Sequence, residues 1–293
     1  IFVSGSYANY SEYSRKVTKL IADAAPLFEK ASIDEFYLDL TGMGKFFDPL
    51  TWTIALRNKI MKETGLPISF GLSSNKMVAK MATNLAKPNG YLQVPFGKEK
   101  EFLAPLFVGE IPGVGKHTQE LLRQLNIKTI KELSECEPKL LQEYLGNQAE
   151  SLQRKSLGIH TSEVSPYHES KSISSENTFN EDSRDLIFLN SELVRLTEKV
   201  CYQLRKEEKV AGCVSVKIRY SDFETFSKQT SISFTSADDE IFPVIKDLFK
   251  KLYTAGMFVR LIGVKVSELT NVSVQTNLFT DTEKKADLYK ALD

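Results

Sequence analysis

The sequence predicts a multidomain α+β protein. Its 293 residues exceed the length that one hydrophobic core usually serves, which indicates more than one domain. Strand-like and helical segments interleave in residues 1–96, and residues 171–270 show the order strand, helix, strand, strand, helix, strand. Between them, residues 97–160 contain only short helical segments separated by Gly, Pro or Asn.

The first region carries three segments of helical periodicity and two strand-like segments. In the helical segments apolar residues recur three and four positions apart, and Gly65 and Pro88 end two of these segments. Helices are predicted at residues 11–28, 51–63 and 75–86, and strands at residues 31–40 and 66–74.

A linker at residues 161–170 precedes the last domain, and a polar tail occupies residues 271–293. The pattern of the last domain predicts one sheet with helices on one face. Its strands are predicted at residues 171–179, 213–220, 225–234 and 258–268, and its helices at residues 183–206 and 238–254.

The composition narrows the classes of function. Basic and acidic residues balance at 38 each, so nucleic-acid binding would depend on local patches of charge. Three cysteines without CxxC or Cys/His spacing argue against a disulfide framework or a zinc site and fit a reducing cytoplasm. Because no apolar run reaches about eighteen residues, we expect no membrane partner.

The stretch ASIDEFYLDL, residues 31–40, places Asp34 and Glu35 side by side in an apolar strand. Successive side chains of a straight strand point to opposite faces, so the pair can converge only where the chain turns. A hairpin with both carboxylates at its tip satisfies this requirement. Two hard oxygen ligands suit Mg²⁺, whereas the simpler interpretation is a solvated strand end.

Two further patterns suit contact with phosphate. IPGVGK places Gly113 and Gly115 before a helix that starts near Lys116, which lets the backbone approach a phosphate at a helix N-terminus; an ordinary turn between helices has the same pattern. In the last domain Lys217 and Arg219 alternate with apolar residues, and hydroxyl residues alternate with Phe226 and Phe234 on the next strand. One sheet face should therefore be polar and partly cationic, and the other should pack under helices.

These patterns lie within longer strings that resemble the Y-family (translesion) DNA polymerases, most closely the bacterial DNA polymerase IV type. SIDEFYLD (32–39) is similar to the catalytic motif of the family's palm domain, and residues 65–91 are similar to its second palm signature. Residues 111–133 resemble the helix-hairpin-helix thumb. KSISSENTF, VSVKIRYSDFETFSKQTSI and RLIGVKVSEL resemble the sheet of the little-finger domain.

The resemblance implies an architecture and a reaction. Residues 1–96 would be a partial palm and fingers, residues 97–160 the thumb and residues 171–270 a DNA-binding little finger. The family transfers a nucleotide from dNTP to a primer 3′-hydroxyl on template DNA with two Mg²⁺ ions. By position Asp34 and Glu35 would bind metal and catalyse, Asp39 would be structural, and Lys87 would contact the triphosphate.

The resemblance also implies roles outside the catalytic motif. Lys76 and Lys80, on the helix that precedes Lys87, would either support it or face water. Arg260 would join Lys217 and Arg219 in binding DNA. The pentapeptide QTNLF in the tail resembles a sliding-clamp-binding peptide, with Gln275 as polar anchor and Leu278 and Phe279 as apolar plugs. The partners would be primer-template DNA, dNTP and the sliding clamp, bound by a bacterial cytoplasmic monomer.

The chain departs from the family at its start. It begins with Ile1, and the opening palm strand with a further metal-binding Asp, the steric gate and the nucleotide-holding Tyr/Arg pair are not found before it. We therefore expect a fragment that extends primers weakly or not at all, with activity in the full-length parent.

The sequence is also compatible with three other interpretations. The first is a non-catalytic accessory protein that binds DNA and the clamp, which the retained Asp34 and Glu35 disfavour. The second is a nucleotide cyclase or similar palm-like enzyme, which leaves the GVGK motif and the last domain unexplained. The third is the DNA-binding module of a repair glycosylase, for which no catalytic Lys or Asp lies in the expected place after the helix-hairpin-helix.

Overall fold

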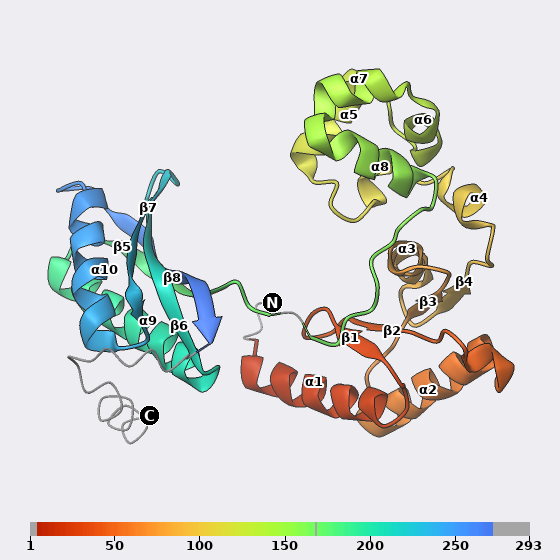
Figure 1. Ribbon diagram of the computed structural model, residues 1–293, viewed down its shortest axis with the longest axis horizontal. Helices are drawn as coiled ribbons and strands as arrows, with labels where there is room; N and C mark the ends of the chain where they lie inside the picture. The colour runs from red at the N-terminus through yellow and green to blue at the C-terminus, as the bar shows by residue number, and fades with distance from the viewer. Residues whose placement is uncertain (1–4, 168, 272–293) are drawn as a thin grey trace. The chain divides into compact units, whose positions relative to one another are not determined.

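The computed structural model describes residues 5–167 and 169–271, which fall into two compact units, Ile1–His168 and Glu169–Asp293. Figure 1 shows helices and short strands in the first unit, and a sheet with two long helices in the second. In the part of the chain so described, no helix combines the length and apolar character needed to cross a membrane.

The first half of the first unit is built from three helices and two small sheets. Strands β1 and β2 pair antiparallel, and β3 and β4 pair parallel. Val17, Ile21, Leu56 and Ile60 pack α1 and α2 together under the first of these sheets. The elements are α1 (Tyr7–Ala22), β1 (Phe28–Lys30), β2 (Phe36–Leu38), η1 (Met43–Lys45), α2 (Pro49–Thr64), β3 (Phe70–Leu72), α3 (Lys76–Ala86) and β4 (Tyr91–Gln93).

Three of the predicted elements are wrong in extent. The strand predicted at 31–40 shortens to Phe36–Leu38, because residues 31–35 form the turn after β1. The predicted helix at 11–28 instead runs from Tyr7, where the Ser6 side chain accepts a hydrogen bond from Asn9 N, to Ala22. Its last predicted residue, Phe28, lies in β1, because Pro26 intervenes and the chain turns into the hairpin. The strand predicted at 66–74 shortens to the three residues of β3.

The second half of the first unit is all-helical, as predicted. Thr129 caps α6 in a capping box, in which Glu132 Oε2 accepts from Thr129 N at 2.8 Å. Buried residues of this region and of α3 share one hydrophobic cluster, in which Met81 and Leu103 both lie. The elements are α4 (Glu99–Leu103), η2 (Val108–Glu110), α5 (Lys116–Gln124), α6 (Ile130–Glu135), α7 (Pro138–Leu145), η3 (Gly146–Gln148) and α8 (Ala149–Ser156).

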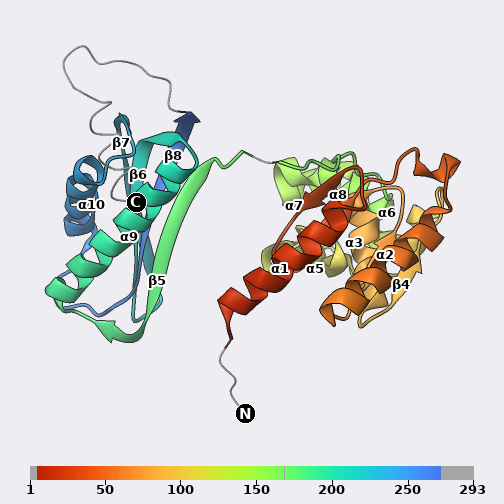
Figure 2. The same cartoon turned by 90° about the horizontal axis from the view of Figure 1, so that it is seen from below.

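The second unit has the predicted order of elements and forms one antiparallel sheet of strand order β5-β8-β6-β7. Apolar residues of both helices form one core with alternate residues of the sheet, such as Val216 and Val264, so the helices cover one face (Figure 2). The elements are β5 (Ser172–Ser183), α9 (Leu186–Lys206), β6 (Lys209–Tyr220), β7 (Thr225–Thr235), α10 (Asp238–Leu252) and β8 (Val259–Asn271).

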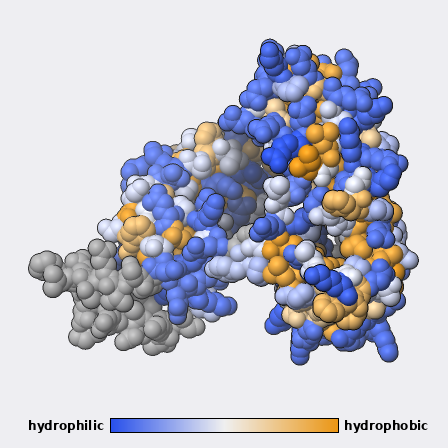
Figure 3. Space-filling model, turned by 45° about the vertical axis from the view of Figure 1, so that its right-hand side comes forward, coloured by the Kyte–Doolittle hydropathy of each residue, from blue (hydrophilic) through white to orange (hydrophobic). Residues whose placement is uncertain are grey.

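Several predictions for this unit differ from the structure. β5 runs to Ser183, where the helix was predicted to begin, so α9 starts only at Leu186, and β8 runs to Asn271. β6 begins at Lys209, four residues early, because Lys209 and Val210 already pair with Asn271 and Thr270 of β8. Lys209 is only 3% exposed and forms an ion pair with Glu169 at 3.4 Å. The expectation that Phe226 and Phe234 pack under helices is wrong, because these side chains are 46% and 59% exposed on the edge strand β7. Exposed apolar side chains lie in separate patches among hydrophilic ones across the visible surface (Figure 3).

Candidate active site and nucleic-acid interface

Asp34 and Glu35 lie in the turn that joins β1 to β2. The hairpin register pairs Lys30 with Phe36, which leaves residues 31–35 as the tip. Ala31 N donates to Glu35 O at 3.0 Å, and the Ser32 hydroxyl accepts from the backbone N–H groups of Asp34 and Glu35 at 3.3 and 3.1 Å. The predicted hairpin is thus present, and Ser32 organises its tip from within.

The two carboxylates have different partners. The Ser32 hydroxyl donates to Asp34 Oδ1 at 2.6 Å, and Asp34 is otherwise exposed at the hairpin tip. Glu35 forms an ion pair with Lys80 Nζ, which reaches it from α3. Of the two roles that the sequence left open for Lys80, facing water is therefore wrong. The pairing holds the hairpin tip against α3.

A second, less exposed ion pair lies one helical turn earlier. Lys76 Nζ lies 2.6 Å from Glu29 Oε2, with side chains only 14% and 9% exposed, and stacks over the Tyr37 ring at 4.9 Å. It also donates to Glu163 O at 3.1 Å, while Glu29 accepts from Ser165 N at 2.9 Å. Lys76 therefore ties the hairpin, α3 and residues 163–165 together and does not face water. Burial and the negative charges of Glu35 and Glu29 raise the pKa of Tyr37.

The hairpin tip fits part of a metal site. Asp34 and Glu35 are neighbouring oxygen donors, one exposed and one partly exposed, and Mg²⁺ is usually held by one or two carboxylates together with substrate phosphates. Among residues 5–167 and 169–271 no group of three or more His, Cys, Asp or Glu side chains is placed to hold a metal ion. The residues present therefore fit a site shared with phosphate, and do not form a closed cage.

Lys87 follows the last residue of α3 and is exposed. It lies seven residues beyond Lys80, which corresponds to about 10 Å along a helix axis. Arg57 of α2 fixes the turn that contains it, because its guanidinium donates to Asn89 O and Asn89 Oδ1 at 2.7 Å each and to Ile68 O at 2.8 Å. Sequence reasoning missed Arg57, since no local pattern links residues so far apart.

The GVG turn precedes α5 as predicted. Gly113 has φ +95°, a left-handed backbone that favours glycine, and Gly115 occupies the N-cap without a capping side chain. Lys155 of α8 donates to Pro112 O at 3.0 Å, and its Nζ lies 3.6 Å from where a Cβ on Gly113 would be. The turn thus combines uncapped N–H groups and Lys116 with a further cation that the sequence analysis did not identify.

The uncovered face of the second unit's sheet carries the predicted cations. Lys217 pairs with Glu176 at 2.6 Å, and Arg219 Nε donates to Thr225 Oγ1 at 2.8 Å. Lys265 lies opposite Ser215 in the register and is exposed, so it adds a cation that was not predicted. Hydroxyl groups from β5 and β7 continue the same face.

Arg260 and the tail complete the predicted set. Arg260 lies 3.3 Å from Asp182 Oδ1, and its guanidinium stacks over the Phe223 ring at 4.8 Å, so local contacts already engage it. Gln275, Leu278 and Phe279 lie outside the described residues.

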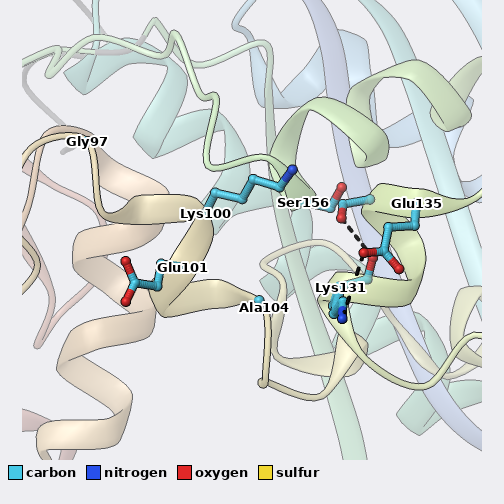
Figure 4. Close-up of a pocket in the computed structure, with 8 residues that line it drawn as sticks. Gly97, Lys100, Glu101, Ala104, Lys131, Glu135 and Ser156 are labelled. Atoms are coloured by element: carbon cyan, nitrogen blue, oxygen red, sulfur yellow. Dashed lines mark hydrogen bonds and ion pairs between the residues drawn. The ribbon is translucent and has the colours of Figure 1, made fainter.

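A shallow hollow lies among α4, α6 and α8 in the all-helical region (Figure 4). Lys131 and Glu135 form a long ion pair of 3.9 Å on one side of it, and Lys100 lies across from them. Its lining mixes both signs of charge and includes none of the predicted site residues: Gly97, Lys100, Glu101, Ala104, Lys131, Ser134, Glu135 and Ser156.

Comparison with known families assigns three stretches of the chain. Residues 1–84 match the impB/mucB/samB family, residues 97–127 match the IMS family HHH motif, and residues 170–288 match the impB/mucB/samB family C-terminal domain. Solved structures share the fold. A Y-family DNA polymerase chimera, Dbh-Dpo4(243-245)-Dbh, has a TM-score of 0.82 at 23% identity, over 92% of this chain and 79% of that one. DinB from Sulfolobus solfataricus has a TM-score of 0.58 at 24% identity, over 91% and 79%.

Curated relatives match along the whole chain. DNA polymerase IV of Dehalococcoides mccartyi strain CBDB1 is 36% identical over 100% of this chain and 76% of that protein. DNA polymerase IV of Desulfatibacillum aliphaticivorans is 33% identical over the same shares. The resemblance first seen in SIDEFYLD is confirmed by these matches. The chain belongs to the Y family of DNA polymerases and is of the DNA polymerase IV type.

Proposed function

We propose that this chain is part of a translesion DNA polymerase, whose complete gene product transfers a nucleotide from dNTP to a primer 3′-hydroxyl during damage tolerance. One observation carries the proposal: the acidic tip of the β1-β2 hairpin, held against α3 by the Glu35–Lys80 ion pair, lies inside the stretch that matches the family. Relatives named DNA polymerase IV, and structures titled as ternary complexes of Dbh DNA polymerase, support it.

Asp34 and Glu35 are the proposed ligands of two Mg²⁺ ions. Bound at this tip, the ions supply activation of the primer hydroxyl and charge neutralisation of the leaving pyrophosphate. Glu35 would exchange its partner Lys80 for metal, and the released ammonium would remain near the incoming phosphates. Asp34 needs no such exchange, because the partner of its Oδ1 among the described residues is the neutral Ser32 hydroxyl.

Lys87 is proposed to bind the triphosphate as a point charge. Its support comes from Arg57, which donates to the backbone and side-chain oxygens of Asn89, just beyond Pro88, and to Ile68 O, which precedes β3. The separation of about 10 Å along α3 between Lys80 and Lys87 leaves room for the phosphates to lie between the hairpin tip and this turn.

Two surfaces of the protein are proposed to contact the DNA backbone without recognising the base sequence. Gly113, Gly115 and Lys116 would hold a backbone phosphate at the start of α5. The uncovered sheet face would contact phosphates through Lys217 and Arg219, with Arg260 as a peripheral contact. We further propose that Gln275, Leu278 and Phe279 bind the sliding clamp, and that the protein acts as a monomer in the bacterial cytoplasm.

Primer extension tests the proposal. The product of the complete gene and residues 1–293 alone are compared with Mg²⁺, each with Asp34→Ala and with Asp23→Ala, an exposed residue at the end of α1, as control. We expect extension by the gene product, loss with Asp34→Ala only, and little or no extension by residues 1–293, because the family implies a further metal-binding Asp. Gene product that binds DNA but incorporates no nucleotide would favour the accessory-protein alternative.

A further inference from the structure

The uncovered face of the second unit's sheet carries an acid opposite one of its cations. In the register Glu176 of β5 lies beside Gly263 of β8, and Gly263 lies beside Lys217 of β6. Glu176 and Lys217 are therefore two strands apart, a backbone separation of about 10 Å. Their side chains nevertheless meet, with Lys217 Nζ 2.6 Å from Glu176 Oε2.

Gly263 makes this meeting sterically possible. A Cβ at that position would lie 3.1 Å from the Glu176 Cβ and 3.5 Å from the Lys217 Cβ. Any larger side chain would stand between the two charged groups, because cross-strand neighbours on one face are in contact. The glycine thus leaves a gap through which the carboxylate reaches the ammonium.

The ion pair is accessible from solvent and stands among cations. Its side chains are 40% exposed for Lys217 and 51% for Glu176. Residues that lie opposite one another across the four strands form a row on this face. The row of Glu176 and Lys217 has the row of Lys265 on one side and the row of Arg219 on the other. Glu176 is the only acid in these three described rows, whose members are Ser174, Lys265, Ser215 and Gln229; Glu176, Gly263, Lys217 and Ser227; Thr178, Leu261, Arg219 and Thr225.

We propose that Glu176 is an internal competitor of DNA phosphate for Lys217. This inference rests on the proposed function of the face, which is contact with the DNA backbone. A phosphate that binds Lys217 displaces the carboxylate, which then remains beside a second negative charge. Both effects weaken the contact, so Glu176 keeps sequence-independent binding loose and shortens the time that the sheet stays on one stretch of DNA.

Fluorescence anisotropy with a labelled primer-template duplex and the 293-residue chain tests the proposal. We compare Glu176→Gln, Lys217→Gln and the double variant, with Glu198→Gln on the exposed side of α9 as a control of equal charge change. Glu176→Gln should tighten binding about twofold to fivefold, the range that an exposed ion pair accounts for. Lys217→Gln should weaken binding and reduce the salt slope by about 0.9, equivalent to one phosphate contact.

The double variant separates direct competition from a general charge effect. If Glu176 acts through Lys217, the increase in DNA affinity from Glu176→Gln should be smaller when Lys217 is already replaced by Gln. An equal gain in both backgrounds, or an equal gain from Glu198→Gln, would overturn the proposal. If Lys217→Gln weakens DNA binding but Glu176→Gln does not increase the affinity, Glu176 is not a competitor. The proposal that this face binds DNA would still hold. If Lys217→Gln and Arg219→Gln both leave affinity unchanged, the proposed function of the face has failed.

Discussion

Replacing Lys76 with methionine should destabilise the first unit far more than the same change at Lys80. Both lysines project from the first half of α3 and both pair with a glutamate of the β1-β2 hairpin. The Lys76–Glu29 pair has side chains 14% and 9% exposed, whereas those of the Lys80–Glu35 pair are 24% and 39% exposed. The two substitutions therefore compare a largely buried pair with an accessible one on the same helix.

The expected magnitudes follow from this difference in burial. A buried acid that loses its cation destabilises a fold by about 3 kcal/mol or more. For Lys76→Met we expect the free energy of unfolding to fall by about 3 kcal/mol, the lower end of this range, because Glu29 keeps the hydrogen bond from Ser165 N. An exposed ion pair contributes about 1 kcal/mol at most to the free energy of unfolding, so Lys80→Met should lower that free energy by less than this amount. Adding Glu29→Gln to Lys76→Met should recover part of the loss.

Urea unfolding monitored by tryptophan fluorescence measures the effect. The chain has a single tryptophan, Trp52, which packs against the core of α1 and α2, so the signal reports the first unit alone. The midpoint should fall clearly for Lys76→Met and only slightly for Lys80→Met. Equal midpoints for the two variants would refute the assignment of Lys76 as the buried structural cation.

Three further predictions concern the other parts of the proposed machinery. Arg57→Gln should raise the KM for dNTP in primer extension by the complete gene product more than it lowers kcat, since it loosens the turn of Lys87; an unchanged KM would contradict this role. Gly113→Ala should lower the free energy of unfolding by about 1 kcal/mol, because a φ of +95° strains any residue with a side chain, and it should also weaken DNA binding. Unchanged stability would contradict this and show that the turn relaxes. Leu278→Ala with Phe279→Ala should abolish capture by the sliding clamp without changing DNA affinity, and equal capture would remove the clamp assignment.

Much of the architecture could be predicted from local pattern. Alternation along residues 31–40 required a turn at Asp34 and Glu35, and the hairpin is where it was expected. The order of elements in the second unit followed from periodicity and from the turn after Tyr220. Helix ends were less predictable, because an apolar stripe does not mark where a helix stops, and the Ser6 cap moved α1 toward the N-terminus.

The contacts that complete the candidate site depend on which strands and helices become neighbours. Periodicity assigns Glu176 and Lys217 to a face, but only the strand order β5-β8-β6-β7 places a glycine between them. The link from Arg57 to Asn89 and the pairing of Lys80 with Glu35 likewise join residues that are distant in sequence. Tertiary packing determines these neighbours, so no local pattern could have predicted them.

The rate of single-nucleotide incorporation with Mg²⁺ by the complete gene product carrying Glu35→Gln tests most directly whether the hairpin tip is the catalytic centre. Metal ions contribute several kcal/mol of transition-state stabilisation, so loss of a metal ligand should slow incorporation at least about a hundredfold. Glu12→Gln, on the exposed side of α1, should leave the rate within about twofold, because it alters only a surface ion pair with Lys16. A Glu35→Gln enzyme as fast as the unmodified one would contradict the claim that the hairpin tip is the catalytic centre.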